Sequence, residues 1–369
     1  MNKGKLNKVA ENQNTITVEI HHSNQTDIQE IEDQWLELQL RSTCHFFLSW
    51  DWIGPWIKKC KGPFYIIKAY RSGQVVALAF IFEKKRKFLG FYSVNQWWLN
   101  RTGDEKYDQV WIEYNDFLID QAFESAVRSS LIEFISKQTL WDEFVCGMML
   151  DQFEHHLSHL SQDKNYLIED MGYQVNLTEI NQKYTTEILS RNTRQKINQT
   201  RRMLELQGEL AFRVLTTAQD KLLALVQIKR IHTEKWQDTA TPSGFTNPVF
   251  VGSIEDQVIC EYCEISTLSL DDTAIGFLVN YIYKGRVYFY LSALCTSFDG
   301  KIKLGMYLHS LSIEHYKEAG MKYYDFLAGK SRYKQSLTNA SYIQNMLCYQ
   351  KSNMRLKIEI WLKRIKSSL

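Results

Sequence analysis

The sequence is poor in the residues and patterns that mark several classes of protein. Its 369 residues include only 17 glycines and 4 prolines, which excludes collagen-like, low-complexity and proline-linker architectures. No stretch approaches the roughly 18 consecutive apolar residues of a membrane-spanning helix. The net charge is only +2, so the chain as a whole is not a polyelectrolyte that binds nucleic acid.

The cysteines and the N-terminal residues indicate a cytoplasmic protein. The seven cysteines are odd in number and scattered, as is typical of reduced thiols. The start of the chain, Met1–Thr15, is polar and lacks the apolar centre of a signal peptide. Cys260 and Cys263 form a lone C-x-x-C, for which two ordinary cysteines near a strand start are favoured over a zinc or redox site. We therefore expect a cytoplasmic protein without a metal.

The pattern that is present suggests two similar halves. Hydrophobic residues make up 44% of the chain and aromatic residues 13%, and the length suits two domains of about 185 residues. In each half a helix precedes a hairpin, a third strand, a second helix and a further strand. The hairpin turns are predicted at Ser72-Gly73 and Asp271-Asp272. Helices mixed with mostly antiparallel strands indicate an α+β fold.

This order sets the expected domain boundaries. We expect a disordered tail over residues 1–14, one domain over 15–170 and a second over 171–350. A basic amphipathic helix is expected over 351–369, where Met354, Ile358 and Trp361 fall on one face. Docking of this helix on the core is favoured, and a peripheral contact with a membrane surface is the alternative.

The segment Gly320–Leu337 combines residue types that suit a substrate-binding corner. Asp325 lies near the end of an apolar strand, and Gly329 permits a tight turn after it. The basic and aromatic residues that follow are Lys330, Arg332, Tyr333 and Lys334. The alternative is an ordinary surface loop in which the aspartate caps the turn.

These residues resemble a known family. The run Tyr324-Asp325-Phe326-Leu327-Ala328-Gly329, followed by Arg332-Tyr333-Lys334, resembles the YDFLxG…YK signature of the BioF2-like acetyltransferase domain. This domain belongs to the GNAT (Gcn5-related N-acyltransferase) superfamily and includes CelD-like proteins. Weaker resemblances occur at Phe46–Trp56, Ser190–Gly208, Tyr288–Ala293 and Leu304–Leu308, where Leu304 replaces a frequent proline. The resemblance implies two tandem GNAT-like domains, as in the FemABX transferases, with the BioF2-like domain second.

The resemblance also implies a binding site for acetyl-CoA or another acyl-CoA as co-substrate. In GNAT domains the thioester lies between two splayed strands, and the pyrophosphate lies at the start of the following helix, where free amides suit an anion. Here the strand before that helix is expected at Arg286–Leu294, and the helix is expected to start near Leu304. The cofactor-binding residues at the helix start are then Lys301, Lys303, Leu304, Gly305 and Met306. The alternative is a helix start that binds only water.

Amine acylation sets the candidate catalytic residues, because the attacking amine must lose a proton. Asp325 and Asp116 are the candidate bases, and Tyr290 and Tyr333 could protonate the leaving thiolate. The candidate substrate-binding residues are Trp50, Tyr114, Arg191, Arg194, Gly329, Arg332 and Lys334. Several of these assignments have alternatives. Asp116 and the nearby Glu113 could be turn residues, the tryptophans could belong to the core, and the basic helix could be a solvated face.

The predicted function is therefore an N-acyltransferase. It would move an acyl group, acetyl first, from acyl-CoA to a small-molecule or sugar amine in polysaccharide or cell-envelope biosynthesis. One alternative is a FemABX-like aminoacyl transferase that uses aminoacyl-tRNA, which the near-neutral charge disfavours. Another is a non-catalytic tandem GNAT protein that binds a partner.

Overall fold

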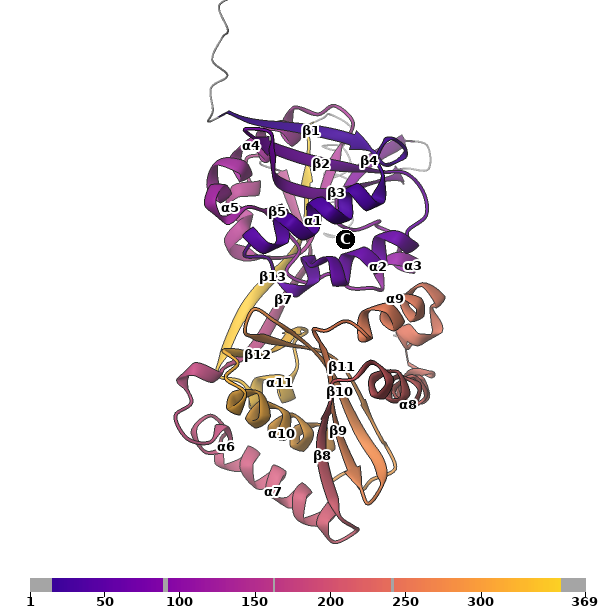
Figure 1. Ribbon diagram of the computed structural model, residues 1–369, viewed down its shortest axis with the longest axis vertical. Helices are drawn as coiled ribbons and strands as arrows, with labels where there is room; N and C mark the ends of the chain where they lie inside the picture. The colour runs from indigo at the N-terminus through magenta and orange to yellow at the C-terminus, as the bar shows by residue number, and fades with distance from the viewer. Residues whose placement is uncertain (1–14, 89–91, 162, 240–241, 353–369) are drawn as a thin grey trace, which may run out of the picture.

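A single mixed sheet runs through both halves of the chain (Figure 1). The computed structural model describes residues 15–88, 92–161, 163–239 and 242–352. The strand order is β1-β2-β3-β4-β6-β13-β7-β12-β11-β10-β9-β8, and β5 (Leu118–Ile119) pairs with β3 outside this path. The molecule is therefore α+β, with a large, mostly antiparallel sheet flanked by helices.

The predicted repeat of element order is confirmed. The strands of the N-terminal half are β1 (Ile16–His22), β2 (Phe64–Arg71), β3 (Gln74–Phe88), β4 (Tyr92–Leu99) and β6 (Glu143–Leu150). Those of the C-terminal half are β8 (Leu210–Leu215), β9 (Cys263–Leu270), β10 (Thr273–Tyr283), β11 (Arg286–Leu294) and β12 (Tyr323–Ala328). In each half an antiparallel hairpin continues into a third strand, which is β4 in the first half and β11 in the second. This third strand pairs in parallel with the strand that follows the next long helix, β4 with β6 and β11 with β12.

Both predicted hairpin turns are confirmed by their backbone conformation. Ser72 and Gly73 have φ of 50° and 79°, and Asp271 has φ of 51°. Positive φ at these positions lets a two-residue turn follow the twist of the paired strands.

Two central strands join the halves. β7 (Asp163–Asn176) and β13 (Ala340–Gln350) pair antiparallel with each other. β13 also pairs with β6, and β7 pairs with β12, so the two strands run between the halves in Figure 1. The domain boundary expected at residue 170 therefore lies within β7. The N-terminal part of the sheet is completed by β13, which comes from the end of the described chain.

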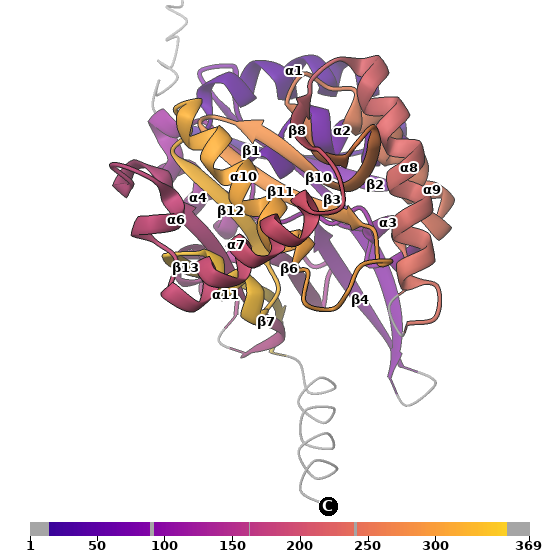
Figure 2. The same ribbon diagram turned by 90° about the horizontal axis from the view of Figure 1, so that it is seen from below.

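Helices cover both faces of the sheet. The longer ones are α1 (Ile28–Arg41), α2 (Trp50–Lys59), α4 (Glu124–Lys137), α7 (Arg191–Glu205), α8 (Ala218–Trp236), α9 (Pro248–Val258) and α10 (Leu304–Glu318). The short ones are α3 (Glu105–Asp108), α5 (Glu154–Leu157), α6 (Tyr184–Glu187) and α11 (Arg332–Leu337). Figure 2 shows α8 and α9 on one side of the C-terminal strands, and α7 and α10 on the other.

The core between α2 and α9 is shared by the two halves. Phe46 stacks on Tyr281 with 4.5 Å between ring centroids, and Trp52 packs edge-on against Tyr290 at 4.9 Å. Aromatic contacts of this kind contribute about 0.5–1.5 kcal/mol each beyond the area they bury. The halves are therefore held together by packed aromatic side chains as well as by the sheet.

Two predicted segments fall mostly or wholly outside the described residues. These are the tail over residues 1–14 and the C-terminal helix over 351–369, of which only residues 351 and 352 are described. Within the described ranges, no helix has both the length and the apolar character needed to cross a membrane.

Candidate active site

The strands β11 and β12 separate after a short parallel pairing. Arg286 pairs with Tyr323 and Tyr288 with Asp325, and beyond this point the two strands no longer pair. A bulge interrupts the pairing of β11 with β10. Val279 of β10 lies opposite Leu291, and the next residue, Asn280, lies opposite Phe289. Tyr290 of β11 is therefore the extra residue of the bulge. Bulges bend strands and occur often beside active sites.

β12 is distorted on the other side of the opening. Its pairing with β7 shifts between Asp325 and Ala328, and Leu327 has φ of 61°, which is rare for a residue with a side chain. Gly329 follows with φ of 114°, which confirms the turn predicted from its sequence position. The two strands diverge as the resemblance to GNAT domains implied.

A cleft of about 390 Å³ lies at this opening. Its walls come from the ends of β11 and β12, from α8 and α11, and from residues 109–113 of the N-terminal half. The polar residues of its lining include Glu113, His232, Lys235, Tyr290, Tyr333 and Lys334. The structure thus brings three of the predicted residues together, namely Tyr290, Tyr333 and Lys334, and adds Glu113 from the other half.

Glu113 is a buried carboxyl group at the cleft. The backbone N–H of Ala328 donates to its Oε2 at 2.9 Å. Burial raises the pKa of Glu113 from its ordinary value of 4.5 to about 8, with Asp325 and Asp170 adding to the effect and Lys334 opposing it. A carboxyl group whose pKa lies near neutrality is suited to take a proton from an amine.

The sequence had offered Glu113 only as a turn residue. It lies in the run Val-Trp-Ile-Glu-Tyr, and a lone carboxylate among apolar residues indicates burial. That signal could have identified it. Its proximity to β12 depends on how the two halves pack, which a local pattern does not contain.

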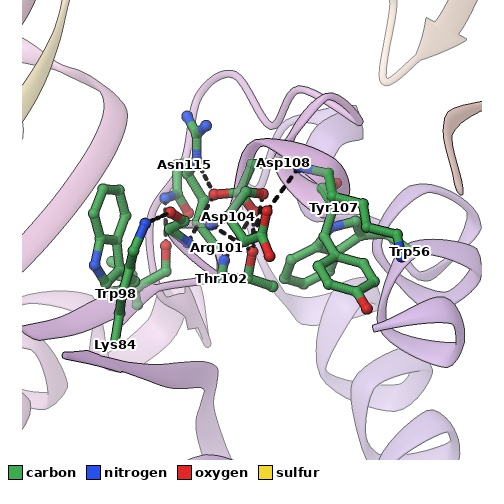
Figure 3. A network of polar contacts seen from close by, with 12 residues as sticks. Trp56, Lys84, Trp98, Arg101, Thr102, Asp104, Tyr107, Asp108 and Asn115 are labelled. Atoms are coloured by element: carbon green, nitrogen blue, oxygen red, sulfur yellow. Dashed lines mark hydrogen bonds and ion pairs between the residues drawn. The ribbon is translucent and has the colours of Figure 1, made fainter. Parts of the chain in front are cut away.

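A polar network anchors the segment that leads to Glu113, and Figure 3 shows the contacts around Thr102 and Asp108. The Asp108 carboxylate accepts hydrogen bonds from the backbone N–H and the hydroxyl of Thr102, each at 2.8 Å. The Arg101 guanidinium lies 4.3 Å from the ring centroid of Trp111, which lines the cleft. Farther along, the N–H of Asn115 donates to the Met148 carbonyl at 3.1 Å. Glu113 is therefore held between two anchored points.

Asp325 is fully buried and does not line the cleft. Tyr342 donates a hydrogen bond to its Oδ1 at 2.7 Å, and Arg286 pairs with its Oδ2 at 3.0 Å. The backbone N–H of Leu327 and the hydroxyl of Tyr114 also donate to this carboxylate. Because four donors already occupy its oxygens, the geometry does not support Asp325 as the base or Tyr114 as a substrate ligand.

Asp116 is also engaged elsewhere. Its two oxygens each lie 2.7 Å from a guanidinium nitrogen of Arg128, in the bidentate geometry of a strong ion pair. Both residues line a second cavity of about 220 Å³ in the N-terminal half, and Asp116 is not part of the cleft lining. The prediction of Asp116 as a base is therefore not supported by its position.

The start of α10 retains the properties expected of a phosphate site. No side chain caps this helix start, and the side chains of Lys301 and Lys303 are exposed beside it. Free amides and two cations suit an anionic group. Leu304 is buried in the core, so only its backbone can contribute, and Met306 is half-buried.

Gly305 has a packing role that the sequence did not indicate. A Cβ atom at this position would lie 2.9 Å from Cδ1 of Leu294 in β11. The glycine thus allows α10 to approach the strand that forms one wall of the cleft. Its absence of a side chain also leaves the helix start open.

The remaining predicted ligands lie apart from the cleft lining. Arg194 donates to the backbone carbonyls of Thr186 and Leu189, at 3.2 and 2.8 Å, and so holds the turn before α7. Arg191 is exposed at the start of that helix. Trp50 is only 5% exposed and packs in the core that the two halves share, so it offers no platform for a substrate.

Lys334 and Arg332 separate because residues 332–337 form a helix. This places Arg332 on the exposed side of α11, whereas Lys334 turns back to the end of β12. Its Nζ donates to the Ala328 carbonyl at 2.7 Å, and burial lowers its pKa. Lys334 therefore supports the wall of the cleft and places a cation near Glu113.

Residues 191–335 match a family model described as an acetyltransferase (GNAT) domain. The match covers less than half of the chain, and over this part the chain is similar to GNAT domains. It includes β11, α10 and β12, so both diverging strands and the open helix start belong to the matched region. No curated protein matches the sequence.

Several solved structures resemble the whole chain. The C-terminal domain of a protein described as a lysylphosphatidylglycerol synthetase from Agrobacterium fabrum is 12% identical, with a TM-score of 0.57 over 90% of this chain and 95% of that chain. L-PGS from Bacillus licheniformis is 11% identical, with a TM-score of 0.54 over 91% and 97%. FemX is 11% identical, with a TM-score of 0.52 over 86% and 96%.

At these identities the likeness concerns the fold. Its extent over both halves shows that the two halves together share the fold of these proteins.

Proposed function

We propose that the protein transfers an acyl group from an acyl thioester to an amine, and that Glu113 is the base. The observation that carries this proposal is the position of Glu113, a buried carboxyl with a pKa of about 8 at the point where β11 and β12 diverge. An acceptor ammonium group must lose a proton before its nitrogen can attack a carbonyl carbon. The pKa of Glu113 lies close enough to neutral pH for its carboxylate to accept that proton and release it again.

The other residues of the cleft have supporting roles in this proposal. The bulge at Tyr290 leaves backbone groups of β11 without a partner strand, and such groups can donate to the oxygen that gains charge during acyl transfer. Tyr290 and Tyr333 line the same cleft, and either hydroxyl could return a proton to the departing thiolate. Lys334 fixes the end of β12.

Acyl-CoA is the proposed donor, and it would supply the activated acyl group. The uncapped start of α10, with Lys301 and Lys303 beside it, would hold its pyrophosphate. Acetyl is the acyl group that the BioF2-like resemblance suggests, and a sugar or small-molecule amine of polysaccharide or cell-envelope synthesis is the acceptor it suggests.

Calorimetric titration with CoA and acetyl-CoA tests the donor. We expect saturable binding of both, and weaker binding after Lys301 and Lys303 are both changed to Ala. The matched control is Lys322→Ala, which removes a cation distant in sequence from the start of α10. Absence of CoA binding by the wild-type protein would exclude acyl-CoA as the donor.

Aminoacyl-tRNA is the second candidate donor. The exposed face of α7 carries Arg191, Lys196, Arg201 and Arg202, and α7 contacts α10 near Lys303, whose N–H donates to Thr200. Such a surface could bind the phosphates of a nucleic acid. Three of the solved structures of similar fold are described as a lysylphosphatidylglycerol synthetase, as L-PGS and as FemX. Salt-dependent tRNA binding without CoA binding would favour this donor.

A further inference from the structure

Asp325 contacts both backbone segments that hold the Glu113 carboxylate. We propose that Asp325 is a positioning residue that fixes these two segments against each other, and so controls the geometry and the charge state of Glu113. This inference rests on the function proposed for the cleft. It replaces the role of base that the sequence suggested for Asp325.

The first segment is the one that carries Glu113 itself. The next residue, Tyr114, has φ of 52°, a conformation that costs a residue with a side chain on the order of 1 kcal/mol. Its hydroxyl donates to Oδ2 of Asp325, and its ring stacks on His45 with 3.8 Å between centroids. His45 is in turn bonded through Nδ1 to the hydroxyl of Tyr288 at 2.8 Å. The strained conformation is thus held from the C-terminal half.

The second segment is the distorted end of β12. The N–H of Leu327, whose φ is 61°, donates to Oδ1 of Asp325 at 2.9 Å. The next amide, that of Ala328, donates to Glu113 at 2.9 Å. Strained residues persist only where their surroundings fix them, and here one carboxylate fixes both strained residues that flank the Glu113 contact.

The remaining contacts of Asp325 come from a cation and a hydroxyl donor. Arg286 pairs with it at 3.0 Å and Tyr342 donates to it at 2.7 Å. These two contacts offset the free-energy cost of burying the Asp325 carboxylate. Removal of its charge would leave Arg286 without its ion-pair partner. All of these contacts are internal, so Asp325 acts on the cleft through its neighbours.

The charge of Asp325 also acts on Glu113 through space. The charged and titratable groups that face Glu113 from the surrounding elements are Asp325, Asp170, Lys334, Tyr290 and Tyr342, and His232 and Lys235 line the same cleft. The negative charge of Asp325 favours the protonated form of Glu113 and raises its pKa. Loss of that charge lowers the pKa of Glu113, and an unpaired Arg286 shifts it in the same direction.

The test compares Asp325→Asn with the double variant Asp325→Asn/Arg286→Gln, in which the two amides can bond to each other. The Glu113 carboxyl is titrated by NMR in protein labelled with ¹³C at glutamate, and its signal is assigned from its loss in Glu113→Gln. We expect the titration midpoint to fall by about one pH unit in Asp325→Asn, which is a tenfold change in the protonation ratio. In the double variant it should fall less, because loss of the Arg286 charge opposes loss of the Asp325 charge. The acid limb of the kcat/KM profile should move with it.

Tyr342→Phe is the matched control, because it removes one hydrogen bond to Asp325 and keeps the charge. A midpoint that stays in place in a folded Asp325→Asn variant, or that moves equally in Tyr342→Phe, would overturn the inference. The NMR titration needs no turnover, so it tests Asp325 even if no acyl donor is used.

Tyr114→Phe covers the case in which both Asp325 variants fail to fold. It frees only the Glu113 segment from Asp325. We expect faster hydrogen exchange at the Ala328 amide and a kcat about tenfold lower with KM unchanged. Exchange and kcat equal to those of wild type would refute the positioning role.

Discussion

Replacement of Glu113 by Gln should stabilise the protein at alkaline pH while it abolishes most of the turnover. Burial raises the pKa of Glu113 from 4.5 to about 8 in the folded protein. Between these two values the folded state binds a proton that the unfolded state has released, so the free energy of unfolding falls as pH rises. The variant lacks this titration and should lack this loss of stability.

The magnitude follows from the two pKa values. A shift from 4.5 to about 8 implies that wild-type protein loses about 4 kcal/mol of unfolding free energy between about pH 5 and pH 9 through this one group. Urea unfolding at both pH values measures the loss. The difference between wild type and Glu113→Gln should therefore widen as pH rises. Turnover at neutral pH should fall by about 10² to 10⁴, the usual contribution of a general base.

Glu318→Gln is the control for this experiment, because Glu318 is exposed at the end of α10. It should leave the pH dependence of wild type in place. If wild type and Glu113→Gln lost stability in parallel between the two pH values, Glu113 would not be a buried group that titrates near neutrality. The assignment of Glu113 as the base would then lose its physical support.

Three further changes separate the roles of other residues. Asp116→Asn leaves the buried Arg128 with only the partly exposed Glu124 as an ion-pair partner and should cost about 3 kcal/mol or less in urea unfolding, while the folded fraction keeps its kcat. Gly329→Ala forces a side chain into a conformation with φ of 114°, and should lower the unfolding free energy by about 1–3 kcal/mol and reduce kcat. Lys301→Glu/Lys303→Glu should raise the KM for acyl-CoA by about tenfold or more in steady-state assays and leave kcat nearly unchanged, because these cations flank only the helix start.

Much of the fold could be predicted from local patterns. The turn residues Ser72-Gly73 and Asp271-Asp272 fix two hairpins, and the periodicity of residues 190–207 and 219–236 identified α7 and α8 nearly to their ends. Turn chemistry and helical periodicity act over a few residues, so a single sequence contains them.

The strands that join the halves could not be predicted in this way. β7 begins with the polar stretch Asp163–Asn165, and β13 pairs with residues of β6 and β7 that lie 166 to 207 positions earlier in the chain. Their formation depends on long-range pairing, which local propensity does not encode. The expected boundary at residue 170 falls within β7 for the same reason.

The candidate site was predicted in part. Tyr290, Tyr333 and Lys334 lie at the cleft because the family signature marks the diverging strands. Asp325 and Glu113 depend on contacts between the halves, and these contacts decide which carboxylate is satisfied internally and which faces the cleft. A sequence pattern ranks both as acidic residues beside strands and cannot separate them.

The central claim is that acyl transfer takes place where β11 and β12 diverge. A crystal structure of the protein with bound acetyl-CoA tests it most directly. The account predicts the pyrophosphate at the start of α10, beside Lys301 and Lys303, and the thioester carbonyl between Tyr290 and Ala328 within reach of an amine held by Glu113. Acetyl-CoA bound at another surface, with the cleft empty, would contradict it.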